Sequence, residues 1–424
     1  MPAVVAVAAA ARIRRLEGRI RHYDWGSRER LAAFRGQPVP ATQPEAELWF
    51  GSHPVACARV EDEGGWVPLD AWIARDPEGS LGSDVVHRFG PRLPFLTKLL
   101  AVAKPLSLQV HPDARCAREG FEREDRAGIP LEAPLRCYRD PHAKPEFVCA
   151  LERFAVLLGF RPLREVAEGL AVAGLADRLP HLAALRRQPE PDVWRAVLGE
   201  LLLLPRDACR EVLAAAAGRA REAGRPAEIG TWIERLSRAF PDDVGALAPL
   251  FLEHVVLEPG QALFLPPGQL HSYLDGMALE VMATSDNVVR AGLTTKHIDR
   301  DEFLRIADFE PRAARPLSPS PVSATELVFA TSADEFRVSR IEVRPDAPHR
   351  CDTVRGVEIL VCVEGAARVV GRGDAVPCAL PRGGGAFVPA ASPGYAVEGD
   401  ARAYRVSVPP PERVHWRQPC GSSS

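Results

Sequence analysis

Two distant stretches of the chain share one pattern, and this repeat limits the fold more than any other feature of the sequence. The first is "EPGQALFLPPGQLHSYLDG", from Glu258, and the second is "PRGGGAFVPAASPGYAVEG", from Pro381. In both, a turn precedes a short apolar run and a Pro-containing turn follows it, so that "FLP" aligns with "FVP". Short strands separated by such turns are typical of jelly-roll barrels, and we predict two of them. The position that matches His271 is Gly394, so a metal site that uses His271 has no counterpart in the second barrel.

The local residue pattern divides the rest of the chain into regions of expected strands and expected helices. Short apolar runs broken by Gly and Pro indicate strands, whereas apolar residues at spacings of three and four, rich in Ala, Leu, Arg and Glu, indicate helices. We therefore predict a mainly β protein with an inserted α-helical domain. The expected parts are an N-terminal extension (1–17, disordered), a barrel domain that carries the site (18–161 and 252–310), a helical domain (162–251), a C-terminal barrel without a metal site (311–410) and a disordered tail (411–424).

Charge and cysteine usage exclude several classes of protein. The formal net charge of -3 gives no basic excess of the kind that nucleic-acid binding needs. The nine cysteines include no CxxC pair, so a reducing cytoplasm is expected rather than a disulfide framework. The short apolar run near the start is followed, not preceded, by arginines, which argues against a secretory signal. It is also too short to span a membrane.

The stretch "KPLSLQVHPD" alternates polar and apolar residues. Ser107, Gln109 and His111 share one face of the expected strand, because successive side chains point to opposite faces. That polar face either meets water or lines a pocket. In "AKPEFVCALERF", Lys144 and Glu146 are also two residues apart and project together.

A further polar pair comes from "LHSYLDGMALEVMA". Asp275-Gly276 predicts a tight hairpin turn, and counting outward from it places His271, Tyr273 and Glu280 on one face. A histidine and a glutamate inside a barrel are costly to bury unless they pair or bind something. One Gln, two His and one Glu form a mixed nitrogen and oxygen set that suits zinc or a similar divalent metal, with a position open for substrate.

With these residues assembled, the sequence resembles the type I mannose-6-phosphate isomerases, or phosphomannose isomerases. The resemblance covers about residues 20 to 300 and runs through "HYDWGS", "AELWFGSHP", "LPFLTKLL", "LSLQVHPD", "KPEF", "LPPGQLHSYL" and "SDNVVRAGLTTKHID". It implies a cytoplasmic, zinc-dependent enzyme with two cupin-type barrels, a bicupin. That enzyme interconverts mannose 6-phosphate and fructose 6-phosphate and feeds GDP-mannose biosynthesis. A monomer that binds a sugar phosphate, and neither nucleic acid nor membrane, is expected.

The resemblance also implies roles for individual residues. One zinc ion per chain would be held by Gln109, His111, Glu146 and His271. The basic residues of the site would be Lys98, Lys144, Arg290 and Lys296, and the pocket would include Trp25, Ser107, Tyr273, Glu280 and Asp286. Ser107 is the expected contact to the substrate phosphate.

The implied reaction moves a proton between two carbons through an ene-diol. Lysines and Arg290 would stabilise the negative charge that develops on oxygen. The proton carrier stays open between two residues: Glu280, and Lys144, where a nearby cation favours a neutral amine. Two other functions remain as alternatives, a non-catalytic bicupin that binds a sugar or a metal and an iron cupin dioxygenase.

Overall fold

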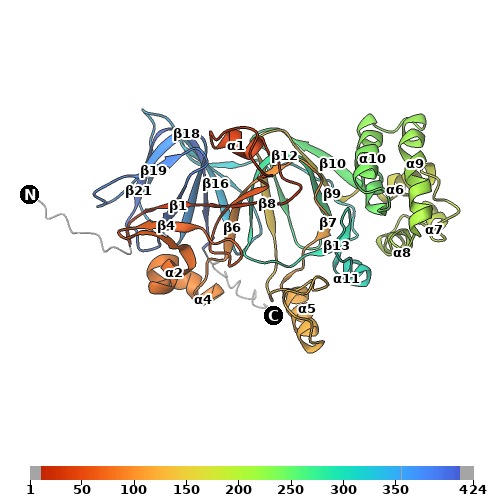
Figure 1. Ribbon diagram of the computed structural model, residues 1–424, viewed down its shortest axis with the longest axis horizontal. Helices are drawn as coiled ribbons and strands as arrows, with labels where there is room; N and C mark the ends of the chain where they lie inside the picture. The colour runs from red at the N-terminus through yellow and green to blue at the C-terminus, as the bar shows by residue number, and fades with distance from the viewer. Residues whose placement is uncertain (1–10, 355, 411–424) are drawn as a thin grey trace, which may run out of the picture.

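The structure, a computed structural model, describes residues 11–354 and 356–410 (Figure 1). Within these residues the named strands form two sheets in which every strand pairing is antiparallel. The first sheet contains β2 (Arg19–Arg21), β3 (Glu47–Phe50), β6 (Phe95–Val102), β7 (Leu108–Val110), β8 (Glu146–Ala150), β9 (Phe154–Phe160), β10 (Leu252–Leu257), β11 (Ala262–Leu265), β12 (His271–Ala283) and β13 (Val289–Gly292). The second sheet contains β1 (Arg14–Glu17), β4 (Arg59–Asp62), β5 (Gly65–Pro68), β14 (Ser320–Ser323), β15 (Glu326–Phe329), β16 (Arg337–Val343), β17 (His349–Cys351), β18 (Glu358–Gly371), β19 (Cys378–Pro381), β20 (Gly385–Val388) and β21 (Tyr395–Ser407).

The helices fall into two groups. Those between β9 and β10 gather at one end of the molecule, and the second sheet lies at the other end (Figure 1). This group consists of α6 (Leu163–Val172), α7 (Leu182–Arg187), α8 (Pro191–Leu201), α9 (Arg206–Glu222), α10 (Ala227–Ala239) and the 3-10 helix η2 (Val244–Leu250). The others are α1 (Arg30–Phe34), α2 (Leu69–Arg75), α3 (Pro77–Leu81), α4 (Ser83–Phe89), α5 (Ala114–Arg126) and α11 (Arg300–Ile306). Among the described residues, none of these helices has the length and apolar character to cross a membrane.

Alternation along the strands of the first sheet separates three apolar clusters. In β8, Phe147 and Cys149 face the second sheet, where Phe147 lies 5.1 Å from Phe329 between ring centroids. Val148 and Ala150 of the same strand face the interior of the first sheet instead. Further along that sheet, the outer face of β9 packs on the helices through residues such as Leu157. Burial of both faces explains why these strands read as nearly continuous apolar runs.

The two halves of the sequence repeat form matching strands. The aligned apolar runs are β11 and β20, each of four residues. Each is followed, after a turn, by a 13-residue strand, β12 or β21. The prediction that the repeat marks equivalent strand pairs therefore agrees with the structure.

The predicted hairpin at Asp275-Gly276 is wrong. β12 continues through both residues, and a bulge between Tyr273 and Asp275 interrupts its pairing with β9. Gly276 has a φ of +120°, and a Cβ there would lie 2.4 Å from the carbonyl oxygen of Arg153, so the close approach of two backbones explains the glycine. The bulge inserts one extra residue, so the alternation of side chains between the two faces is reversed after it. Glu280 therefore still lies on the same face as Tyr273, as predicted.

The expected disorder of the N-terminal extension is also wrong for Arg14–Glu17, while residues 1–10 and the predicted tail 411–424 lie outside the described residues. These four residues form β1, which pairs with β20 on one side and β4 on the other. β1, β4 and β5 thus extend the sheet of the C-terminal strands, although β1 precedes the first sheet in sequence and β4 and β5 lie between its strands β3 and β6. Arg14–Glu17 are ordered because β1 covers an edge of β20 that would otherwise be open.

Candidate metal centre and substrate pocket

Three side chains that are far apart in sequence meet at one end of the first sheet. Glu146 is the first residue of β8, His271 is the first residue of β12, and His111 follows β7 directly. Pro112 comes next, and Asp113 caps α5 by accepting a hydrogen bond from the backbone N–H of Cys116. Because α5 begins at Ala114, two residues after Pro112, His111 lies in the short link between strand and helix.

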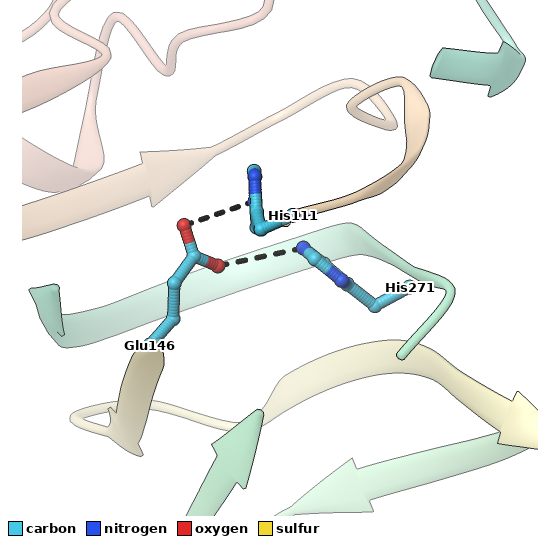
Figure 2. Close-up of side chains that lie close together, drawn as sticks. All are labelled: His111, Glu146 and His271. Atoms are coloured by element: carbon cyan, nitrogen blue, oxygen red, sulfur yellow. Dashed lines mark ion pairs between the residues drawn. The ribbon is translucent and has the colours of Figure 1, made fainter. Parts of the chain in front are cut away.

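Figure 2 shows the Glu146 carboxylate facing both imidazole rings, with one oxygen pointing to each ring. His111 Nε2 lies 3.2 Å from one carboxylate oxygen, and His271 Nε2 lies 3.4 Å from the other. One donor atom from each of the three residues lies within 4.8 Å of the other two. All three side chains are buried.

The hydrogen bonds of the two rings determine which nitrogens carry protons. His111 Nδ1 donates to the carbonyl oxygen of Asn287 at 2.8 Å, and His271 Nδ1 donates to that of Gln269 at 2.9 Å, because a carbonyl oxygen only accepts. In the neutral rings, both Nε2 atoms therefore present lone pairs to a carboxylate that also only accepts. His111 Nε2 and Glu146 Oε2 accordingly have no hydrogen-bond partner. Buried acceptors that face one another need a cation between them, so these residues fit a bound metal.

The pKa shifts agree with that reading. Burial lowers the pKa of His111 to about 4, against the opposing effect of Glu146, so the ring is neutral and able to ligate. Burial acts to raise the pKa of Glu146, but nearby positive charge, from His111 when its ring is protonated and from Lys144 throughout, holds it well below its usual range. Lys144 Nζ lies 3.3 Å from Glu146 Oε1.

The fourth predicted ligand lies beside this group. Gln109 pairs with His271 in the register of β7 and β12. Its amide nitrogen is 3.5 Å from His271 Nε2, and its oxygen accepts a 3.0 Å hydrogen bond from the hydroxyl of Ser107. The structure thus brings all four predicted ligands together.

A cavity of about 540 Å³ opens next to the three donors. Apart from His111 and His271, the predicted site residues all line it: Trp25, Lys98, Ser107, Gln109, Lys144, Glu146, Tyr273, Glu280, Asp286, Arg290 and Lys296. The volume suits a small metabolite.

One wall of the cavity holds a buried chain of charges. Glu280 and Lys98 are cross-strand neighbours in β12 and β6, with 2.9 Å between Oε2 and Nζ. Burial and the nearby Glu146 raise the pKa of Glu280, although Lys98 opposes the shift. The pKa of Lys98 is raised because its carboxylate neighbours outweigh burial. The Tyr273 hydroxyl is buried without a hydrogen-bond partner, and burial together with Glu280 raises its pKa well above the usual value.

Two further cations line the cavity. Arg290 lies in β13 opposite Gln109, and Lys296 follows four residues after that strand. In the described part of the chain, neither side chain forms an ion pair with a carboxylate. Burial and Arg290 both lower the pKa of Lys296. Two close cations without counterions favour an anionic ligand.

Among the lining residues that sequence reasoning missed, two form ion pairs with predicted site residues. His53 Nε2 lies 3.3 Å from Asp286, and Glu47 Oε1 lies 3.9 Å from Lys98 Nζ. Glu47 belongs to β3, which pairs with β6, but no polar alternation around it pointed to the pocket. Only the contacts between strands place these two residues in the site.

Comparisons with known proteins agree with this geometry. The family model for the catalytic domain of phosphomannose isomerase type I matches residues 13–163. The mannose-6-phosphate isomerase of Salmonella typhimurium is 37% identical over 398 residues, which are 93% of this chain and 99% of that protein. The enzyme of the same name from Escherichia coli is 37% identical over 399 residues, with the same coverage.

Solved structures give the same result for the whole fold. A zinc-bound mannose 6-phosphate isomerase superimposes with a TM-score of 0.86 at 36% identity, covering 95% of this chain and 100% of that one. A second, bound with zinc and yttrium, gives a TM-score of 0.85 at 35% identity and the same coverage. From its sequence, its mainly antiparallel β fold and its His-Glu-His centre, this chain belongs to the mannose-6-phosphate isomerase family.

Proposed function

We propose that this chain interconverts mannose 6-phosphate and fructose 6-phosphate, with one zinc ion held by Gln109, His111, Glu146 and His271. One observation carries the proposal: two imidazole lone pairs point at a buried carboxylate, and no proton lies between them. This group lies at the wall of a cavity that is also lined by cations without a carboxylate partner among the described residues. The relatives carry the isomerase name, and solved relatives are bound with zinc. The two alternatives raised from sequence, a non-catalytic binding protein and an iron dioxygenase, are therefore not favoured.

Gln109 completes the proposed ligand set by a rotation of its amide. Turning the end group by half a turn brings the oxygen to the side of His271 Nε2 and the nitrogen to the hydroxyl of Ser107. The Ser107 hydroxyl can accept from that nitrogen, so its hydrogen bond to Gln109 is kept, while the 3.5 Å contact of the Gln109 nitrogen with His271 Nε2 is given up. A zinc ion in this set supplies Lewis-acid stabilisation for charge on the substrate oxygens.

We propose Glu280 as the proton carrier. Its raised pKa brings a carboxyl closer to the pH at which it can both accept and release a proton. The neighbouring Lys98 ammonium steadies the carboxylate form after the proton has left. Lys144 remains the second candidate, since it reaches into the same cavity beside Glu146.

The phosphate group is proposed to lie against Arg290 and Lys296. These cations have no carboxylate partner among the described residues, whereas Lys98 and Lys144 are both engaged by glutamates. Arg139 adds a further positive charge near Lys296. In the proposed ligand set Ser107 accepts from the Gln109 nitrogen, so its hydroxyl proton stays free to donate to the phosphate.

Several broader expectations belong to the same proposal. We interpret the two sheets as two cupin-type barrels, and the helices between β9 and β10 as a domain inserted into the first barrel. The cysteines among the described residues are all free thiols, which supports a reducing compartment such as the cytoplasm. A monomeric enzyme that supplies GDP-mannose biosynthesis remains part of this proposal.

Isotope transfer tests the reaction and its proton carrier together. Zinc-loaded protein incubated with mannose 6-phosphate in deuterated water should yield fructose 6-phosphate that carries deuterium at C1. Glu280→Gln should bind zinc and substrate but lose both turnover and exchange, while Lys144→Met should retain exchange. Exchange lost only in Lys144→Met would transfer the role to that residue, and absence of any fructose 6-phosphate with the parent protein would contradict the proposed function.

A further inference from the structure

The backbone that carries the proposed phosphate-binding cations makes an unusual turn. Between Arg290 and Lys296, Gly292 has a φ of +158° and Leu293 a φ of +53°. Within the described residues, Leu293 is the one non-glycine residue at positive φ. A leucine in this region of backbone conformation costs free energy and persists only when surrounding contacts hold it there.

Asp243 supplies those contacts from the far end of the helical segment. It precedes η2, and its Oδ1 accepts a hydrogen bond of 2.8 Å from the backbone N–H of Gly245. Its other oxygen, Oδ2, accepts one of 3.2 Å from the backbone N–H of Thr294, in the turn itself. The first bond is an ordinary helix cap, but the second crosses to another element and has no role in capping.

The two segments also approach too closely for side chains. A Cβ at Gly245 would lie 3.0 Å from the backbone nitrogen of Leu293, and a Cβ at Gly292 would lie 2.8 Å from Asp243 Oδ1. Glycine at both positions therefore lets the carboxylate reach the turn.

The Asp243 carboxylate interacts with backbone N–H groups and not with a cation. Burial raises the pKa of its carboxyl, and the opposing effects come from the N–H groups of Gly245, Thr294 and Leu293. Among the described residues it forms no ion pair. The neighbouring Asp242, by contrast, lies 3.7 Å from Arg210 within the helical segment.

We infer that Asp243 is a positioning residue, whose carboxylate bridges η2 to the Gly292–Thr294 turn and thereby sets where Arg290 and Lys296 stand in the substrate pocket. Both cations line the cavity, as do Leu293 and Thr294. Asp243 is not among the lining residues, so it contributes to the site without touching substrate. This inference rests on the proposed function for its substrate, and it concerns recognition of the phosphate group.

Replacement by asparagine separates the two functions of the carboxylate, which are to cap η2 and to hold the Gly292–Thr294 turn. Asparagine caps helices as well as aspartate does, but it has one acceptor oxygen, so only one of the two N–H donors can be satisfied. We expect Asp243→Asn to melt close to the parent protein and to bind zinc normally. Its KM for mannose 6-phosphate should rise by about 10- to 100-fold, the range that small misplacements in a site produce, with a smaller fall in kcat.

Inorganic phosphate gives a readout that is independent of turnover. Its dissociation constant, measured by calorimetry on the zinc-loaded protein, should rise by the same factor as KM in Asp243→Asn. Amide hydrogen exchange at residues 292–295 should become faster in this variant, while exchange in β12 stays unchanged. Asp242→Asn is the matched control, and all these quantities should keep their parental values in it.

The outcomes distinguish the inference from the proposed function. Parental phosphate affinity and parental KM in Asp243→Asn would overturn the inference, even if Asp243→Ala were unstable. A parent protein that binds phosphate but never isomerises mannose 6-phosphate would overturn the proposed function, and the phosphate measurements would still decide the role of Asp243.

Discussion

Each of the two sheets contains a glutamate at an equivalent position, and the side chains around the two glutamates differ. Glu146 opens β8 and pairs with Leu265, and Glu358 opens β18 and pairs with Val388. Leu265 and Val388 occupy the same position of the sequence repeat, so the two glutamates correspond. Both are buried. A buried carboxylate needs compensation, and the molecule provides it in two ways.

Around Glu358, side chains of the protein itself compensate the buried negative charge. The Tyr395 hydroxyl donates to Glu358 at 2.6 Å, and Arg405 lies 3.7 Å away while also pairing with Glu326. Tyr395 opens its 13-residue strand as His271 opens β12, so tyrosine and not Gly394 is the structural counterpart of the histidine. Around Glu146, two imidazoles offer lone pairs and no proton. The comparison teaches that the Glu358 centre is closed by a hydroxyl proton and an arginine, whereas the Glu146 centre, although Lys144 reaches one carboxylate oxygen, still leaves imidazole lone pairs that can receive a metal.

The prediction that only the first centre binds metal follows from this contrast. Across residues 11–354 and 356–410, His111, Glu146 and His271 form the one group of close metal-ligating side chains. His349 lies near the second centre, but its Nδ1 is 3.0 Å from the hydroxyl of Thr325.

Exchanging each glutamate for glutamine tests the comparison with the largest expected effect. Glu146→Gln removes a charged ligand, and we expect zinc to be lost and kcat/KM to fall by about 10³-fold, as when a main electrostatic contact is removed. Glu358→Gln should keep one zinc per chain and parental activity per folded molecule. Metal analysis and isomerase assays on both variants check this. Equal losses of activity in folded samples of both would break the comparison.

Arginine replacements separate stability from activity. Arg405→Met leaves Glu326 and Glu358 buried without their cation, and we expect about 3 kcal/mol less stability in urea unfolding, with activity retained in the folded fraction. Arg290→Met should do the reverse, because Arg290 has no ion-pair partner among the described residues to leave behind. It should lose most of its turnover and little stability. A stable Arg405→Met variant would mean that the second centre is not held by its internal cation.

A pH titration of the metal-free protein gives a smaller effect. The folded pKa of His111 is lowered to about 4 from 6.5, so the unfolded chain binds a proton that the folded one excludes between these values. The corresponding stability is fully present above pH 6.5 and is lost as the pH falls toward 4, by up to about 3 kcal/mol. Urea unfolding of the protein and of His111→Gln from pH 7 to pH 4 measures it. The variant should show the shallower dependence, and identical slopes would contradict the burial of a neutral ring.

Local pattern predicted the site better than it predicted the fold around it. The alternation in "KPLSLQVHPD" and "KPEF" is a property of single strands, so it correctly paired Gln109 with His111 and Lys144 with Glu146 before any sheet was known. The repeat identified matching strands for the same reason. The ligands themselves needed the family resemblance, because no local rule joins His111 to His271.

The failures share one physical cause, which is contact between distant segments. Asp275-Gly276 has the composition of a tight turn, but a neighbouring backbone at Arg153 requires the glycine instead. The pairing of β1 with β20 depends on an edge that exists only after the C-terminal strands assemble. Glu47, His53 and Asp243 act through partners from other elements. None of these partners can be read from the residues nearby in sequence.

Zinc content measured alongside isomerase activity tests the central claim most directly. Purified protein should contain one zinc ion per chain and convert mannose 6-phosphate to fructose 6-phosphate. Removing the metal with a chelator should abolish the conversion, and returning one equivalent of zinc should restore it. Full conversion by protein stripped of metal, or no conversion by protein with its zinc in place, would contradict the account.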